Sequence, residues 1–424
     1  MSDRSIRSFT LVELLIVIAI LAVLAAAVVI VLNPAELLAQ ARDSQRVTDL
    51  KNIKKSIDLF VVDNPTVSLG TEERVYISLP DTASNCPNLT SSLPTLPSGW
   101  QYVCATSANL RNTNGSGWIP VNFGSVFGGS PIPYLPIDPS NDLASGKYYT
   151  YVMGGSYELT ALMEAAKENV SVNDGGSLPG VFQVGTHIDL TPPTRDKGLV
   201  GYWSLDGALG SITNGQTAGL KDSSGKGNNG TASNANATGM AFVIGQVGNA
   251  VQFDGADDYI ESFVTSENLI TNNGPVTISF WTNITNYPAL HAAKTEFVGC
   301  NEYHTQSKGG GVGVGINETG IITMIGDTSS TSEYAYSSSN FPISQWTLIS
   351  MTYDSGTVKM FKNGNFLGSS PRLSWKTNTN PFRIGRGTQG GWNSYSLSGI
   401  IDDVRVYSRA LSDVEIKSIY EATK

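Results

Sequence analysis

The longest apolar run of the chain lies near its N-terminus. Residues 9–32 contain one charged residue, Glu13, and no glycine or proline. Folded as a helix, this run is about 36 Å long, which is enough to cross a hydrocarbon core of about 30 Å. Arg4 and Arg7 precede it, and basic flanks stay on the cytoplasmic side. The pattern predicts a single-pass anchor with a cytoplasmic N-terminus and the rest of the chain outside the membrane.

The helical pattern continues beyond this run. Apolar residues recur there at spacings of three and four, namely at Val47, Leu50, Ile53, Ile57 and Phe60. Such a stripe packs one face of a helix onto a globular part of the chain. Pro34 interrupts the hydrogen-bond ladder and predicts a kink or a loosened turn. We therefore expect one long helix over residues 9–62.

The remaining sequence alternates short apolar runs with turn residues, which is typical of β-structure. The run VTISFWTNI (276–284) has a period of two, so its alternate side chains face opposite sides of a sheet. In VKMFKNGNFLG (358–368), Asn363–Gly364 predicts a tight hairpin turn. Ser412 and Glu415 form a capping-box pattern, which predicts one helix at the end of the chain.

Changes in this pattern divide the chain into parts. The segment LTPPTRDK contains paired prolines, which favour an extended, semi-rigid spacer. The expected parts after the helix are a small head (63–189), this linker (190–197) and an all-β sandwich or jelly roll (198–424).

The charge balance argues against one class of partner. The formal net charge is −9 at pH 7, and the sequence contains no stripe of basic residues. Proteins that bind nucleic acid usually carry such a stripe. We therefore expect no nucleic-acid partner.

The chain contains three cysteines. Cys86 and Cys104 flank a loop rich in proline, serine and threonine, and in an exported protein they can form a disulfide that stabilises the fold by roughly 3 kcal/mol. The alternative is two independent thiols. Cys300 has no obvious partner and is expected to be a small buried residue.

Glu13 needs an explanation, because a carboxylate within a membrane helix costs roughly 2.5–3.5 kcal/mol. One possibility is that the side chain reaches back to water at the cytoplasmic interface. The other begins with cleavage after Ser8, which creates a new α-ammonium group on Phe9. The Glu13 carboxylate of a neighbouring subunit then neutralises this charge inside an apolar filament.

The segment SFTLVELLIVIAILAVLAA resembles the N-terminal motif of type IV prepilins and of the pseudopilins of type II secretion. The resemblance implies a leader (1–8) that prepilin peptidase removes between Ser8 and Phe9, followed by N-methylation of Phe9. It also implies that Glu13 is needed for assembly with other pilin subunits. The family strongly prefers glycine before the cut, where this chain has Ser8. The segment YLPIDPSNDLASGKYYTYVMGGSYELTALME is similar to the end of pilin heads, which implies a small α/β-roll-type head.

The C-terminal part resembles the laminin G-like, concanavalin A-like sandwiches. The matching blocks include GLVGYWSLDG, GNAVQFDGADDYIE, VTISFWTN and LSGIIDDVRVYSRALSDVEI. The resemblance implies two curved antiparallel sheets and a binding role, often toward glycans. The expected fold class is α+β: a long N-terminal pilin helix with a small head, followed by a concanavalin A-like jelly-roll sandwich.

Carboxylates in these blocks are candidate ligands for a structural Ca²⁺, because calcium prefers oxygen ligands. The resemblance implies Asp206, Asp222 and Asp402. Asp403 points to the other face if its strand is regular. The alternative is that these carboxylates cap turns and pair with Arg405.

The sequence favours binding over catalysis. It contains no paired acidic pattern of a glycosidase strand, and its three histidines show no catalytic or zinc spacing. Aromatic side chains in loops offer flat faces for sugar rings, and Trp392 and Tyr395 lie in such a loop-like stretch. Trp203 and Trp281 lie in strands and are expected to be packing residues.

These features lead to a functional hypothesis. The protein is a minor pilus subunit at the filament tip, held first in the inner membrane and then displayed at the cell surface, with a sandwich that binds a glycan or a surface protein. A bulky C-terminal domain has more room at a tip than along a filament. The alternative is a pseudopilin of a secretion or DNA-uptake machine that uses the sandwich to recruit cargo.

Overall fold

We describe the fold from a computed structural model. It describes residues 11–12, 14–21 and 34–424, except for 95, 97–98, 155, 166–170, 172–173, 177, 179, 187–189, 191, 193–197, 234–238, 266–267, 269, 272, 287–294, 301–310, 318–319, 327–330, 337–340, 372–379 and 387–396. The predicted helix over 9–62 is thus described at 11–12 and 14–21 and again from Pro34 onward.

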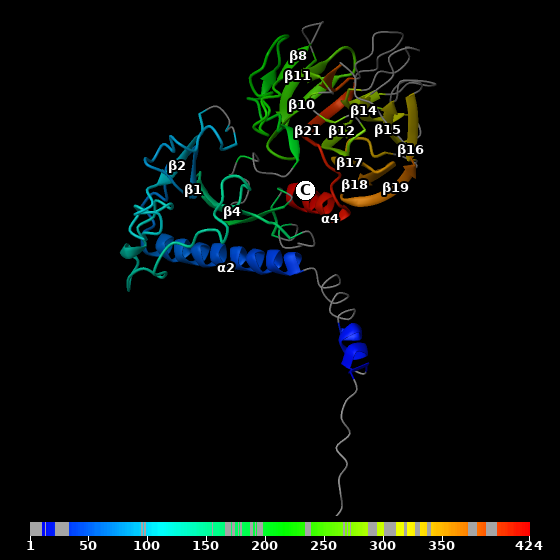
Figure 1. Cartoon of the computed structure of the whole chain (residues 1–424). Coiled ribbons are helices and arrows are strands. Elements are labelled where there is room, and N and C mark those ends of the chain that lie inside the picture. The colour runs from blue at the N-terminus through cyan, green and yellow to red at the C-terminus, as the bar shows by residue number, and fades with distance from the viewer. Residues whose placement is uncertain are drawn as a thin grey trace, which may run out of the picture.

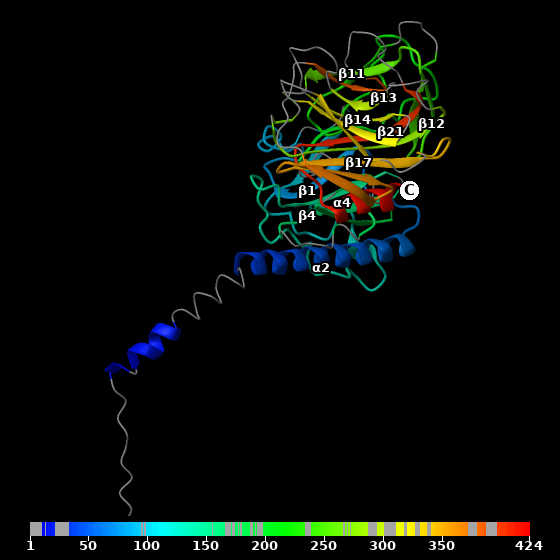
Figure 2. The same cartoon turned by 90° about the vertical axis from the view of Figure 1, so that its right-hand side faces the viewer.

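The first globular part is a helix packed on a five-stranded sheet (Figures 1 and 2). The sheet order is β2-β1-β3-β4-β5; β1 and β2 are parallel and the other neighbours are antiparallel. The elements are α2 (Pro34–Asp63), β1 (Arg74–Pro80), β2 (Gln101–Ala105), η1 (Phe123–Ser125), β3 (Tyr149–Met153), β4 (Tyr157–Leu162) and β5 (Val181–Gly185).

The predicted apolar stripe of α2 forms the contact with this sheet. Leu50, Ile53, Ile57 and Phe60 are buried in one cluster with Tyr149 and other sheet residues, and Val47 packs against the cluster. The prediction that this stripe packs one face of the helix onto a globular part of the chain is confirmed. We call this part, α2 with the five-stranded sheet and its loops, the head.

The second globular part is a sandwich of two sheets. The nine-stranded sheet has the order β19-β18-β17-β12-β21-β10-β9-β7, with β6 also paired to β21, and the seven-stranded sheet has the order β16-β15-β14-β13-β20-β11-β8. The strands are β6 (Leu199–Trp203), β7 (Gly210–Ser211), β8 (Gly230–Ser233), β9 (Ala241–Ile244), β10 (Asn249–Asp254), β11 (Tyr259–Thr265), β12 (Val276–Ile284), β13 (Thr295–Gly299), β14 (Gly311–Asn317), β15 (Gly320–Gly326), β16 (Thr331–Tyr336), β17 (Thr347–Asp354), β18 (Thr357–Lys362), β19 (Asn365–Pro371), β20 (Pro381–Ile384) and β21 (Ser398–Tyr407).

Strand β12 shows how the period of two builds this sandwich. Ile278 and Phe280 enter the apolar cluster between the two sheets, whereas Trp281 enters a second cluster on the outer face. Helix α4 (Asp413–Thr423) covers that outer face, and the Trp281 indole donates a hydrogen bond to Thr423 Oγ1 at 2.9 Å. Alternation along one strand therefore supplies both layers of the core.

Two local predictions are confirmed. Asn363 and Gly364 join β18 to β19 with φ angles of 49° and 71°, as a two-residue hairpin turn requires. Ser412 caps α4 in a capping box with Glu415. The chain is an α+β protein, in which a large two-sheet β-sandwich follows the helical N-terminal part.

Both parts have their own hydrophobic core. The two clusters of the sandwich contain only residues between Leu199 and Tyr420. The two clusters of the head contain only residues between Val47 and Leu190. Among the described residues no cluster mixes the two sets, so each part buries these apolar side chains within itself, which is the condition for independent folding.

Candidate functional site

The residues expected to direct processing and assembly lie at the N-terminus. Ser8, Phe9 and Glu13 lie outside the described residues. Residues 11–12 and 14–21 are helical, and their large apolar side chains are exposed, from 45% for Val17 to 79% for Leu11. Within the described residues, no helix is both long and apolar enough to cross a membrane.

The head contains the disulfide considered in the sequence. Cys86 and Cys104 are joined, with their Cα atoms 5.4 Å apart, and the bond ties the loop before β2 to that strand. Cys300 is a buried free cysteine of the sandwich whose thiol donates to the carbonyl of Val312 at 3.6 Å.

A buried ion-pair network joins α2 to the rest of the head, and no local pattern along the chain indicates it. Arg46 is fully buried and donates two hydrogen bonds to the Asp138 carboxylate, at 2.7 and 2.9 Å. It also contacts Asp43 at 2.7 Å and Glu164 at 2.9 Å. Arg42 adds a second contact to Glu164. Asp138 also caps its own turn, because its Oδ1 accepts the Ser140 amide at 2.8 Å.

Two of the three predicted calcium ligands lie against one tight turn of the sandwich. Asp402 Oδ2 accepts the backbone amides of Gln246 and Val247, at 2.9 and 2.8 Å. Asp206 Oδ1 accepts the amide of Asn249 at 2.8 Å. We call Asp206, Asp402 and the turn 245–249 the acidic cradle.

Glycine is required at two positions of the acidic cradle. A Cβ atom on Gly245 would lie 2.5 Å from Asp402 Oδ2, and one on Gly248 would lie 2.3 Å from Asp206 Oδ1. Gly248 also has a φ of 66°, a conformation that L side chains rarely adopt. The turn thus allows the two carboxylates to approach its backbone closely.

The electrostatics of the acidic cradle favour an added positive charge or a proton. Asp402 is fully buried, and its Oδ1 has no hydrogen-bond partner in the described part of the chain. Burial, together with the negative charges of Asp403 and Asp206, raises the pKa of Asp402 to about 8. Burial also raises the pKa of Asp206. A buried carboxylate oxygen without a donor fits a hard cation, so Asp206 and Asp402 suit calcium.

A β-bulge interrupts β21 at Asp403, so the strand lacks the regularity that the expectation for this residue assumed. Asp403 has a φ of 52°, and the register of β21 against β12 shifts at this point. Asp403 and its neighbour Asp402 are both buried, and Asp403 has 2% exposure. It forms an ion pair with Arg405 at 3.0 Å, and the Arg405 guanidinium lies 4.9 Å from the Tyr202 ring centroid.

Asp222, the third predicted ligand, is used differently. Its Oδ1 accepts the amides of Tyr202 and Ser224, both at 2.9 Å, and its Oδ2 accepts the Ser224 hydroxyl at 2.8 Å and the Asn228 amide at 2.9 Å. These four donors occupy both oxygens. Asp222 therefore caps a turn, which is the alternative role considered for these carboxylates. None of these four bonds joins it to the acidic cradle.

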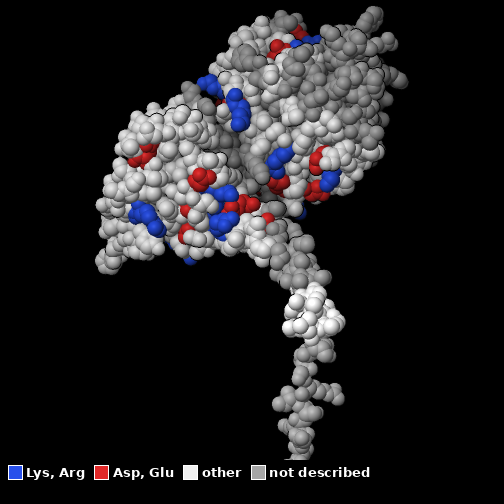
Figure 3. All heavy atoms as spheres, in the orientation of Figure 1, with Lys and Arg blue, Asp and Glu red and all other residues white. Residues whose placement is uncertain are grey.

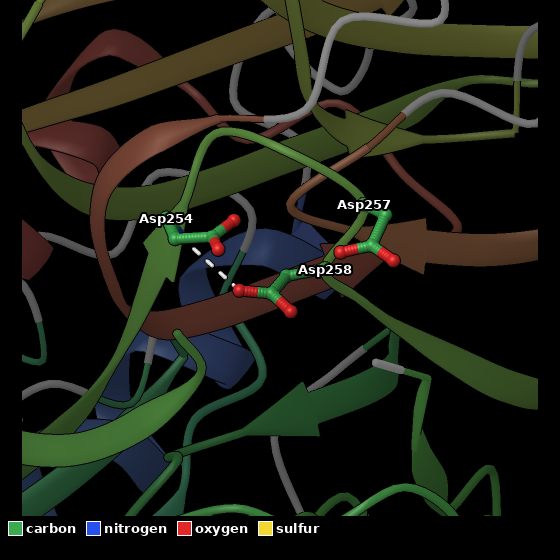
Figure 4. A group of neighbouring side chains, drawn as sticks. All are labelled: Asp254, Asp257 and Asp258. Atoms are coloured by element: carbon green, nitrogen blue, oxygen red, sulfur yellow. Dashed lines mark hydrogen bonds between the residues drawn. The ribbon is translucent and has the colours of Figure 1, made fainter. Parts of the chain in front are cut away.

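A second acidic group lies at the turn between β10 and β11 (Figure 4). One carboxylate oxygen from each of Asp254, Asp257 and Asp258 lies within 4.8 Å of the others. Asp258 is fully buried, and burial together with the charges of Asp254 and Asp257 raises its pKa to about 6. This group was not predicted, although its signal, three aspartates within five positions, stands in the FDGADDYIE block.

The predicted sugar-binding aromatic residues, Trp392 and Tyr395, lie outside the described residues. The strand that follows their loop begins at Ser398, which pairs with Asp254. On the face shown in Figure 3, acidic and basic side chains of the described residues are interspersed over both globular parts.

Two family models match the sequence. The prokaryotic N-terminal methylation motif matches residues 3–29. The concanavalin A-like lectin/glucanases superfamily matches residues 254–417. The chain therefore carries the N-methylation motif of prokaryotic pilins together with a concanavalin A-like domain. No curated protein matches the chain.

Several solved structures are similar to the chain at low identity. Domain 4 of AbnA, an extracellular GH43 arabinanase from Geobacillus stearothermophilus solved with arabinotriose, is 20% identical, with 52% of this chain and 98% of that domain covered and a TM-score of 0.39. The binding domain of Paraclostridial Mosquitocidal Protein 1 is 17% identical, with 53% of this chain and 52% of that one covered and a TM-score of 0.39. The botulinum neurotoxin type G receptor binding domain is 17% identical, with 53% and 51% covered and a TM-score of 0.37. The chain spans about half the length of these two toxin domains.

Proposed function

From a chain that joins a pilin-type methylation motif to a concanavalin A-like domain, we propose a pilus subunit that binds a surface ligand. The subunit is minor and located at the filament tip, and its sandwich (198–424) binds a glycan or a surface protein without catalysis. The observation that carries the proposal is the presence of both matches on one chain, at residues 3–29 and 254–417. The separate cores of head and sandwich support a displayed binding domain.

The N-terminal part of the proposal concerns processing. Prepilin peptidase cleaves between Ser8 and Phe9, Phe9 is N-methylated, and Glu13 neutralises the new terminal ammonium group of a neighbouring subunit. The subunit lies in the inner membrane before it enters the filament. Mass spectrometry of the native protein should give an N-terminal peptide that begins with methylated Phe9. An intact Met1 in material from filaments would contradict this part.

The metal part of the proposal places calcium at the acidic cradle. Asp402, through its buried Oδ1, and Asp206 would hold the ion, and bound calcium would supply positive charge that stabilises this edge of the sandwich. Asp222 is the weaker candidate, because protein donors already occupy its two oxygens.

Binding by the sandwich is the first prediction. The 198–424 fragment, which has its own core, should bind particular glycans on an array, and a chelator should weaken binding by about tenfold or more, as loss of a site-stabilising ion does.

Trp392→Ala and Tyr395→Ala should each weaken the same binding, because an aromatic face contributes to sugar contact. Trp281→Phe, a change under α4, is the control expected to retain it.

Experiments on cells test the location of the subunit at the filament tip and its assignment to a pilus. Antibodies to the sandwich should label filament ends, and deletion of residues 198–424 should reduce adhesion while filaments remain. Labelling along whole filaments would contradict the tip location. Loss of secretion or of DNA uptake, with adhesion unchanged, would instead favour the pseudopilin alternative.

A further inference from the structure

A polar pocket lies on the head, and all the residues that line it belong to the head. Its volume is about 490 Å³, and its lining includes Ser107, Arg111, Asn112, Asn114 and Tyr134. Pockets that hold small ligands usually measure about 300–1,000 Å³. The pocket therefore has room for a sugar ring with its substituents.

Arg111 is held in place by a backbone carbonyl and an aromatic ring. Its Nε donates to the carbonyl of Leu135 at 3.0 Å, and its Cζ lies 4.0 Å from the centroid of the Tyr134 ring. Among the described residues it forms no ion pair. The charge of Arg111 acts on the Asp49 carboxylate to lower its pKa, against a larger rise from burial, but Asp49 itself accepts the Tyr149 hydroxyl at 2.9 Å. The two terminal nitrogens of Arg111 are thus available to an anion from solution.

Two amide side chains are fixed beside this guanidinium. Asn112 Nδ2 donates to Asn109 Oδ1 at 3.2 Å and to Ser116 Oγ at 3.1 Å, and Asn114 Oδ1 accepts the Ser116 amide at 3.1 Å. These bonds leave Asn112 Oδ1 and Asn114 Nδ2 without a partner in the described part of the chain. The pocket thus offers one fixed acceptor and one fixed donor.

Tyr134 supplies the apolar face. Its side chain is 52% exposed although the Arg111 guanidinium stacks on it. Sugar rings pack their C–H faces on exposed aromatic rings, and hydroxyl groups bond to amide side chains. A guanidinium recognises a carboxylate with two parallel hydrogen bonds.

We propose that this pocket binds an acidic saccharide, a pyranose that carries a carboxylate. The carboxylate bonds to the terminal nitrogens of Arg111, the ring packs on Tyr134, and the hydroxyl groups bond to Asn112 and Asn114. A neutral sugar leaves Arg111 unused, and a bare anion leaves the aromatic face and the amides unused. The pocket belongs to the head, so the inference stands independently of binding by the sandwich.

The test uses the full chain in detergent, with a chelator throughout so that calcium-dependent binding by the sandwich does not contribute. Trigalacturonate and 3′-sialyllactose are titrated in a calorimeter, beside the methyl ester of trigalacturonate and lactose as matched neutral sugars. At least one acidic sugar should bind with saturation, and its neutral counterpart should bind at least about tenfold more weakly, because it cannot form hydrogen bonds between a carboxylate and the guanidinium.

Variants then assign the binding to the pocket. Arg111→Gln should weaken binding about tenfold or more, Arg111→Lys should recover part of the loss, and Tyr134→Leu should weaken binding with unchanged salt dependence. Arg74→Gln, which removes the same charge elsewhere on the head, should bind like the wild type, and equal melting temperatures should show that the variants are folded. Absence of binding to both acidic sugars, equal binding of the neutral sugars, or wild-type binding by Arg111→Gln would overturn the proposal.

Discussion

Replacing Arg46 with methionine is expected to lower the free energy of unfolding of the head by about 3–5 kcal/mol, the usual cost of leaving buried charges unpaired. Arg46 is fully buried and contacts three carboxylates, those of Asp43, Asp138 and Glu164. Methionine fills a similar space but donates no hydrogen bond. The loss is measured by urea unfolding of a chain that lacks residues 1–33, with near-ultraviolet circular dichroism as the signal.

Arg42→Met is the matched control for this prediction. The Arg42 side chain is 38% exposed and contacts Glu164 alone among the network carboxylates. Exposed ion pairs contribute about 0.2–1 kcal/mol, so the loss should stay below about 1 kcal/mol. Equal losses for the two variants would show that burial of Arg46 does not set the strength of the network.

The same network predicts a response to acid. Burial alone would raise the pKa of Glu164, but hydrogen bonds from Arg42, Lys147 and Arg46 lower it to about 2. A carboxyl whose pKa is lower in the folded state stabilises the fold above its unfolded pKa of 4.5, and the contribution is lost as the pH falls toward 2. The advantage of the wild type over Arg46→Met should therefore shrink across this range.

The sandwich is expected to lose stability as the pH rises from about 4 to about 8 when no divalent cation is present. The pKa of Asp402 is raised from 3.8 to about 8 in the folded state, so folding retains a proton that the unfolded chain releases in this window. The resulting loss in the free energy of unfolding is complete above pH 8. At about 1.4 kcal/mol per pKa unit, this loss reaches at most about 6 kcal/mol. Thermal unfolding of the 198–424 fragment at pH 5 and pH 8, in chelator, measures it.

Two variants and calcium separate the causes of this pH dependence. Asp402→Asn should abolish most of it, whereas Asp354→Asn, at an exposed carboxylate, should leave it unchanged. Calcium should stabilise the wild type more at pH 8 than at pH 5, because a ligand must lose its proton before it binds the metal. A melting temperature that rises between pH 5 and pH 8 in chelator would contradict the proposed state of Asp402. Equal stabilisation of Asp402→Asn by calcium would place the ion elsewhere, and the three-aspartate turn at 254–258 is the alternative site.

The sequence by itself determined the elements whose signals are local. The stripe from Leu50 to Phe60 set the buried face of α2, and Asn363–Gly364 set a hairpin turn. The capping box at Ser412 set the start of α4. Each signal spans at most a few helical turns or one turn of the chain, so the periodicity of side chains and the conformational preference of single residues carry it.

Only the tertiary structure decided which charged groups meet. Arg46 and Asp138 are 92 positions apart, and Asp402 meets the Val247 amide across 155 positions. The bulge at Asp403 depends on the partner strand, and the bonds to Asp222 depend on how its turn closes. Spacing along the chain does not encode such contacts. They follow from how the strands pair and pack, because burial gives an ion pair or an unpaired carboxylate its energetic weight.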